Sequence, residues 1–156
     1  GVAGTTRLLK NVCGLWLVQQ CRAAWQRAGT DRSWEELTTL AAGAPPLATI
    51  VDPDHPSLVA PPDMPEAIRN LARAAGEPVP DTTGAIVRTA LESVAAAIRR
   101  TLGELDSVVG RRIPRVHVAG GGGVDLPALR GIVRASFEPR RYEPRDTARW
   151  DERLGR

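Results

Sequence analysis

Apolar residues recur at helical intervals along the first segment of the chain. Within residues 8–28 they return every three or four positions, and Gly29 follows where a C-terminal cap belongs, so a helix is predicted there. Its middle part, VCGLWLV at residues 12–18, is apolar on all sides, which predicts burial over most of its surface. Asn11 and Gln19 stand at the polar edges of this part, where either one alone would be an ordinary cap or a solvent-facing side chain.

A capping box marks the second predicted helix. Ser33 and Glu36 have the three-residue spacing that lets each satisfy a backbone N–H of the other. Leu37 and Leu40 then supply an apolar face, and Gly43 ends the helix. The pattern therefore predicts a short helix that stops before a proline-rich stretch.

The stretch that follows, residues 45–65, is dense in proline and aspartate, which excludes regular structure and predicts an ordered surface loop. Its aspartates lack the spacing of a calcium loop, so we expect turns and caps rather than a metal site from Asp52, Asp54 and Asp63. His55 is a lone histidine among prolines, for which a structural or solvent-facing role is expected. The third helix is predicted over residues 63–75, closed by a glycine.

The longest predicted helix covers residues 84–109 and ends at Gly110. Its large apolar residues alternate steps of four and three, which predicts one stripe packed against the rest of the domain: Val87, Leu91, Val94, Ile98, Leu102, Leu105 and Val109. Two oppositely charged pairs at spacing i,i+4, Arg88 with Glu92 and Arg100 with Glu104, are expected on the other faces.

A short apolar run, RVHVA at residues 115–119, predicts a buried strand that ends in four consecutive glycines. Glycines leave the peptide N–H groups uncovered, so an anion such as phosphate can approach the bare backbone. The run matches neither the GxxxxGK[ST] nor the GxGxxG pattern. On its own it is more typical of a turn that joins a strand to a helix.

Composition narrows the class of protein. The 156 residues have the size of one domain, and they contain neither an apolar run long enough to span a bilayer nor a signal-peptide pattern, so no membrane association is expected. Cys13 and Cys21 fall in one predicted helix, too far apart for a disulfide within it, which favours reduced thiols in the cytoplasm. The net charge of +3 comes from arginines interleaved with acidic residues, so no nucleic-acid partner is expected; steeply salt-dependent binding would indicate one.

Five segments resemble, in order, motifs of the FGGY family of carbohydrate kinases, most closely those of the rhamnulokinase type. RLLKNVCGLWLVQQ resembles the pattern [RV]LxNxxGLWLLQ, and SWEEL resembles SYEEL. IVDPDHPSLVAPPDM resembles IDPDDPxFxxPxDM, TGAIVRTALES resembles PGEIVRCILES, and VHVAGGG resembles IHIVGGG. The resemblance is strongest over residues 6–122.

The resemblance implies an α/β fold: a partial actin-like, ribonuclease H-like (hexokinase-type) ATPase domain over residues 1–137, mostly helical with a sheet remnant. It implies transfer of a phosphoryl group from Mg-ATP to a hydroxyl of L-rhamnulose, with ATP and Mg²⁺ as cofactors. By the same resemblance Asn11 would contact the sugar and Gln19 the nucleotide. ATP would lie against the glycine loop, Gly120, Gly121 and Gly122.

Two departures from the family pattern limit what is expected of this chain alone. The family's catalytic aspartate lies in a GxHD-like segment upstream of the matching part, and nothing in this sequence resembles it, so no catalytic residue is assigned. Beyond the glycines, residues 138–156 form a divergent tail rich in arginine and proline, which either a change of reading frame or divergence would produce. We therefore expect little kinase activity from these residues by themselves.

Two alternatives remain open at the level of sequence. The chain is compatible with a non-catalytic remnant, or with a subunit that completes a kinase with a separate N-terminal half. The sugar is also open, because fuculose and xylulose kinases belong to the same family; the GLWLVQQ segment favours rhamnulose.

Overall fold

The computed structural model describes residues 4, 6, 8–113 and 152, and within them it contains helices and no strand. The elements are α1 (Trp16–Arg27), α2 (Trp34–Gly43), the short 3-10 helix η2 (Pro56–Leu58), α3 (Met64–Ala74) and α4 (Thr83–Val109). They belong to one compact unit, Gly1–Arg112. The strand predicted at residues 115–119, the glycine loop and the tail at 138–156 lie outside the described residues, apart from the isolated position 152.

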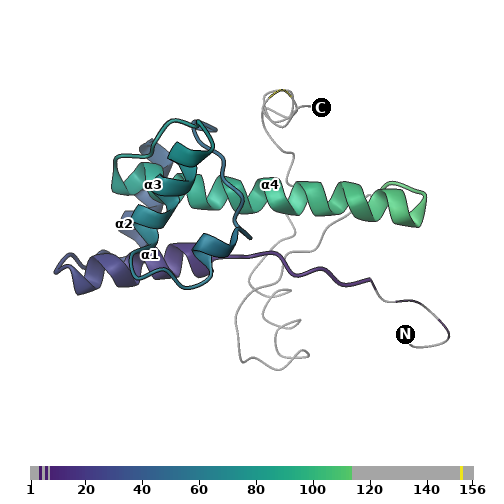
Figure 1. The fold of residues 1–156 in the computed structure, drawn as a ribbon, viewed down its shortest axis with the longest axis horizontal. Helices are drawn as coiled ribbons and strands as arrows, with labels where there is room; N and C mark the ends of the chain where they lie inside the picture. The colour runs from purple at the N-terminus through teal and green to yellow at the C-terminus, as the bar shows by residue number, and fades with distance from the viewer. Residues whose placement is uncertain (1–3, 5, 7, 114–151, 153–156) are drawn as a thin grey trace, which may run out of the picture. The chain divides into compact units, whose positions relative to one another are not determined.

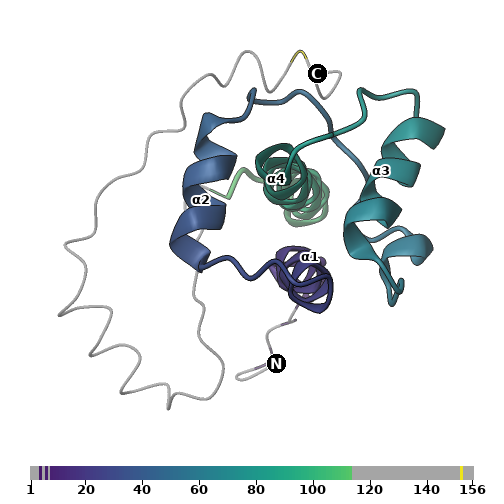
Figure 2. The ribbon, with the colours of Figure 1, turned by 90° about the vertical axis from the view of Figure 1, so that its left-hand side faces the viewer.

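Helix α4 is the central element of this unit. Helices α1, α2 and α3 gather around its N-terminal half, and its C-terminal half continues beyond them (Figure 1). In the view along α4, α2 and α3 lie on opposite sides of it, and α1 packs against both α3 and α4 (Figure 2). Within the described part of the chain, every helix is either too short or too polar to cross a membrane.

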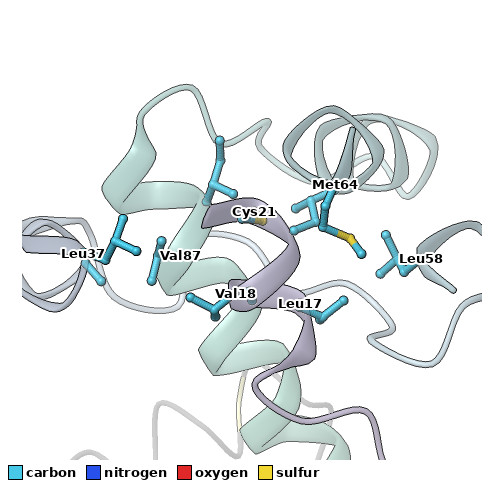
Figure 3. Close-up of a cluster of buried hydrophobic side chains, with 11 residues drawn as sticks. Leu17, Val18, Cys21, Leu37, Leu58, Met64 and Val87 are labelled. Atoms are coloured by element: carbon cyan, nitrogen blue, oxygen red, sulfur yellow. The ribbon is translucent and has the colours of Figure 1, made fainter. Parts of the chain in front are cut away.

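The core lies where these helices meet (Figure 3). Its members come from α1, α2, η2, α3 and α4: Leu17, Val18, Cys21, Leu37, Ala41, Leu58, Met64, Ile68, Ile86, Val87 and Ala90. Burial of one large aliphatic side chain of this kind stabilises a fold by about 1.5–3 kcal/mol. The cluster therefore joins segments that are far apart in the sequence into one cooperative unit.

Helix α4 turns a different face to the core from the one predicted. Its buried residues are mostly small, including Gly84, Ala90, Ser93 and Ala97, whereas several large members of the predicted stripe are exposed, namely Leu91, Ile98 and Val109. The reason is the close approach of α2: a Cβ on Gly84 would lie 2.3 Å from the backbone oxygen of Leu40. Only a face of small residues permits two backbones to come this near. The predicted stripe is therefore confirmed at Val87 and Val94, which lie in or against the core, and is wrong for its exposed members.

The first helix is shorter than predicted. It begins at Trp16 rather than at residue 8, and Leu15 occupies the N-cap without a side-chain hydrogen bond, so Asn11 is not a cap. Leu15 and Trp16 are exposed, which contradicts the predicted burial of residues 12–18 on all sides, although Leu17 and Val18 are buried. Gly14 weakens a helix at this point, and Lys10 and Cys13 are bonded to other parts of the fold.

The predicted caps and helix ends are confirmed where neighbouring residues determine them. Ser33 and Glu36 form the capping box at the start of α2. Asp63 accepts the N–H of Glu66 at the start of α3. Gly110 closes α4 in the left-handed conformation, at φ 70°. The ends of these helices are therefore determined by local signals that can be recognised in the sequence.

The Arg88–Glu92 pair, expected to decorate a solvent-facing surface, instead joins α2 to α4. The Arg88 guanidinium donates to Glu92 and to three carbonyl oxygens at the end of α2, those of Ala41, Ala42 and Ala44. Side-chain exposure is only 25% for Arg88 and 13% for Glu92. Because the last carbonyls of a helix lack partners within it, Arg88 acts as a cap supplied by another helix.

The loop after α2 is ordered, as predicted, and partly buried. Leu47, Thr49 and Val51 are buried in alternation with more exposed neighbours, as along an extended strand. Side chains of α4 hold this part of the loop: Glu92 accepts the Leu47 N–H at 2.7 Å, and Ser93 Oγ accepts the Val51 N–H at 3.0 Å. The polar groups of α4 thus take the place that a neighbouring strand would have in a sheet.

Candidate functional site

The candidate sugar-contacting residue, Asn11, lies in the irregular segment that precedes α1. Its side chain is exposed and is therefore available to a ligand. Residues on either side of it contact other parts of the fold. The Lys10 side-chain ammonium pairs with Glu104 of α4, and the backbone N–H of Cys13 donates to Asp54 Oδ1 at 2.7 Å. Asn11 is thus held between two anchors that come from distant parts of the sequence.

The carboxylate of Asp54 is itself fixed by the structure of its loop. The Asp54 N–H donates to Asp52 Oδ1 at 3.2 Å, and the His55 N–H donates to the Asp52 carbonyl. His55 Nδ1 then accepts the Ser57 N–H at the start of η2, which buries Leu58 in the core. Asp52 and Asp63 make a turn and a cap as predicted, and His55 has the predicted structural role, whereas the Asp54 carboxylate bonds a distant segment instead. Within the described residues, no three His, Cys, Asp or Glu side chains cluster in a way that could hold a metal ion.

Arg100 and Glu104, the second predicted i,i+4 pair, attract each other electrostatically, and each also contacts another segment. Arg100 pairs with Asp52 at 3.6 Å, and Glu104 pairs with Lys10. The Lys10 hydrogen bond lowers the pKa of the Glu104 carboxyl below its ordinary value. Both contacts join the exposed C-terminal half of α4 to the segments around Asn11, which sequence spacing alone did not reveal.

The candidate nucleotide-contacting residue, Gln19, lies in the first turns of α1 with an exposed side chain. Leu17 and Val18, next to it, point to the core and fix the helix face that presents it. Because α1 begins at Trp16, Asn11 lies outside the helix that carries Gln19, so the two residues do not share one helix as the sequence predicted. The remaining predicted nucleotide contacts, Gly120, Gly121 and Gly122, lie outside the described residues.

The two cysteines are free thiols in different environments. Burial raises the pKa of the half-buried Cys13 thiol, and the nearby Asp54 carboxylate raises it further. Burial raises the pKa of Cys21 to about 12, so this thiol stays protonated at neutral pH. Cys21 is a core side chain, and Cys13 is the more accessible of the two.

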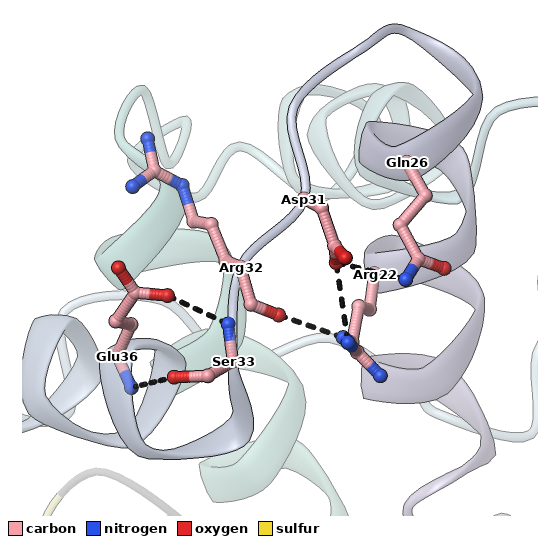
Figure 4. A network of polar contacts seen from close by, with 6 residues as sticks. All are labelled: Arg22, Gln26, Asp31, Arg32, Ser33 and Glu36. Carbon is pink, nitrogen blue, oxygen red and sulfur yellow. Dashed lines mark hydrogen bonds and ion pairs between the residues drawn. The ribbon is translucent and has the colours of Figure 1, made fainter.

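A polar network around Arg22 joins the end of α1 to the start of α2 (Figure 4). The guanidinium donates to the Arg32 carbonyl at 2.7 Å and pairs with Asp31, and it lies 5.0 Å from the ring centre of Trp34. The Gln26 amide donates to the same Asp31 carboxylate, and this bond is the first cause of the lowered Asp31 pKa. These bonds are satisfied among themselves, so the network supports the fold and offers no unpaired group for chemistry.

A hollow of about 130 Å³ lies between the loop after α2 and the N-terminal part of α4. Prolines line much of it, and its charged members include Arg88 and Glu92. Those two side chains are bonded to each other and to backbone groups, which leaves little polar capacity for a ligand. The segment around Asn11 and the exposed face of α1 therefore form the better candidate site.

Comparison of the sequence with known proteins finds one family profile and several relatives that bear the same name. A profile described as the C-terminal domain of the FGGY family of carbohydrate kinases matches residues 1–132. A rhamnulokinase of Bacteroides thetaiotaomicron is 32% identical over 191 aligned positions, covering 97% of this chain and 39% of the relative. Rhamnulokinases of Pectobacterium carotovorum and Yersinia pestis are 33% and 34% identical, covering 87% and 78% of this chain. The chain spans between 24% and 39% of the length of these relatives.

Proposed function

Because this chain belongs to the FGGY family of carbohydrate kinases, whose C-terminal domain is of the actin-like ATPase type, we propose that it is the nucleotide-binding portion of a rhamnulokinase-type enzyme. The reaction would transfer a phosphoryl group from Mg-ATP to a hydroxyl of L-rhamnulose. The observation that carries this proposal is the match of residues 1–132 to the family, together with relatives named rhamnulokinase over most of the chain.

Within this proposal, Asn11 contacts the sugar, and Gln19 contacts the nucleotide. The exposed side chains of both residues support the assignment, since neither is used to hold the core together. The backbone N–H groups of Gly120, Gly121 and Gly122 would donate hydrogen bonds to the negatively charged phosphates of ATP. Catalysis of phosphoryl transfer consists mainly of positioning and charge stabilisation, and donors of this kind are suited to it.

The proton of the sugar hydroxyl needs an acceptor, which we place outside these 156 residues because the sequence has no match to the family's GxHD-like segment. These residues alone are then expected to bind nucleotide but to phosphorylate little sugar. The alternatives from a different class are a non-catalytic remnant and a subunit that works with a separate kinase half. A kinase for fuculose or xylulose is the alternative within the same family.

Calorimetric titration of Mg-ATP and ADP into the purified chain tests the nucleotide site. The expected result is binding that Gly121→Val abolishes and that Gly123→Val, the matched control outside the assigned loop, retains. A wild-type chain that binds neither nucleotide would contradict the proposed site. ADP release assays with L-rhamnulose, L-fuculose and D-xylulose test the reaction, with a heat-killed control. Rapid L-rhamnulose-dependent release by the chain alone would contradict the external proton acceptor.

A further inference from the structure

We propose that Asp54 is a positioning residue that holds the Asn11 segment in its sugar-binding conformation, an inference that rests on the proposed role of Asn11. The connection is direct: Asp54 Oδ1 accepts the backbone N–H of Cys13 at 2.7 Å, two residues beyond Asn11. A hydrogen bond from an amide to an ionised carboxylate is among the stronger ones in proteins. Asp54 therefore acts on the backbone that carries Asn11 and not on the sugar.

The segment needs such an anchor because it has no regular structure of its own. Asn11 precedes the first residue of α1 by five positions, so the hydrogen-bond ladder of the helix does not reach it. The other anchor, between Lys10 and Glu104, joins side chains that are 42% and 51% exposed. Solvent and salt screen an exposed pair of this kind, which contributes little to rigidity. The bond to Asp54 therefore constrains the backbone beside Asn11, together with the packing of the half-buried Cys13 side chain against the core.

Asp54 can serve this purpose because its own position is fixed. Asp52 accepts the N–H groups of Asp54 and His55, and the capped turn η2 follows immediately. The buried Leu58 of that turn attaches the whole loop to the core, at 2% exposure. The chain of contacts runs from the core through η2 and Asp54 to the backbone of Cys13, and so to Asn11. The loop thereby transmits the rigidity of the helices to an exposed side chain.

This arrangement has a consequence for ligand binding. Cys13 lies two positions along the chain from Asn11, a reach of at most about 7 Å. Misplacement of a ligand-contacting group by about 1 Å can weaken its contribution to a reaction by up to about 100-fold. Release of the Cys13 N–H is therefore expected to weaken sugar binding, while Gln19, on the separate helix α1, keeps its place.

The test compares Asp54→Ala, which removes the acceptor, with Asp54→Asn, which keeps an oxygen of the same geometry. Asp81→Ala, a loss of an exposed aspartate in the loop before α4, is the matched control. Affinities for L-rhamnulose and for Mg-ATP are measured separately on the full chain by ¹⁵N NMR titration. Amide hydrogen exchange at Cys13 is followed in the same samples.

Asp54→Ala is expected to weaken L-rhamnulose binding about tenfold, to leave Mg-ATP binding within about twofold, and to speed exchange at Cys13. Asp54→Asn is expected to restore most of the sugar affinity, and Asp81→Ala to match the wild type. Equal sugar affinity in Asp54→Ala and wild type would overturn the inference, as would an equal loss of sugar and nucleotide binding. A wild-type chain that binds no sugar would overturn the proposed role of Asn11 first, and this inference with it.

Discussion

Replacement of Gly84 by alanine is expected to force α2 and α4 apart. Gly84 lies in the first turn of α4, directly against the backbone of Leu40 in α2. An added Cβ would lie 2.3 Å from the Leu40 oxygen and 2.7 Å from its carbonyl carbon. Both are backbone atoms, so no side-chain rotation relieves the overlap, and the helices themselves must move.

The size of the effect follows from that geometry. Ordinary contact with a Cβ begins at 3.4 Å, so the two backbones must separate by about 1 Å. A gap of this size forfeits a quarter to a half of the dispersion energy at each affected contact, and overpacked cores typically lose about 1–3 kcal/mol. Alanine favours the helix over glycine by up to about 1 kcal/mol. The net loss in the free energy of unfolding is therefore expected to be up to about 2 kcal/mol.

Urea unfolding followed by circular dichroism measures this loss. With a typical slope for a small domain, a loss of about 2 kcal/mol lowers the urea midpoint by about 1 M. Gly43→Ala is the matched control, because a Cβ at Gly43 in α2 meets nothing within 4 Å. That variant is expected to keep the wild-type midpoint or exceed it slightly. A Gly84→Ala midpoint equal to that of Gly43→Ala would refute the close packing of the two helices.

Two further predictions concern side chains whose environment the structure defines. Arg88→Ala removes three bonds to the end of α2 and leaves the nearly buried Glu92 carboxylate without its cation. The free energy of unfolding in urea is expected to fall by about 2–3 kcal/mol, less than for a fully buried pair because Arg88 is a quarter exposed. Arg100→Ala removes only an exposed ion pair and should lower it by less than about 1 kcal/mol, so equal losses in the two variants would contradict the capping role of Arg88. In a thiol titration at pH 8, Cys13 is expected to react slowly and Cys21 only after denaturant is added, because burial raises the pKa of both thiols and that of Cys21 to about 12. Asp54→Ala should speed the reaction of Cys13, because the Asp54 carboxylate also raises its pKa. Equal reaction rates of the two thiols in the folded protein would contradict these environments.

The parts of the fold that sequence predicts best are those decided by neighbouring residues. The capping box of Ser33 and Glu36 needs only three-residue spacing, and Asp63 and Gly110 likewise act on their own helix ends. The start of α1 and the buried face of α4 depend instead on distant groups. The bond from Cys13 to Asp54 spans 41 positions, and Leu40 constrains Gly84 from another helix. No local periodicity contains that information.

The candidate site shows the same division. The assignment of Asn11 and Gln19 comes from the family pattern, and the structure finds both side chains exposed without testing their roles. The strand and glycine loop predicted beyond residue 114 stay predictions, because the described residues do not include them. The anchoring of the Asn11 backbone by Asp54 was outside the reach of sequence analysis, since an aspartate between prolines is typical of any turn.

The irregular loop after α2 has a further consequence for how the domain opens. Side chains of α4 bond its backbone at Leu47 and Val51, and its alternate residues are buried. A protease must draw several residues of extended chain away from a folded surface before it can cleave them. Here that movement would also break the contacts of α4, so the loop is released only when the helices separate. A stretch that the sequence predicts as a surface loop is thus expected to resist digestion about as well as the helical core.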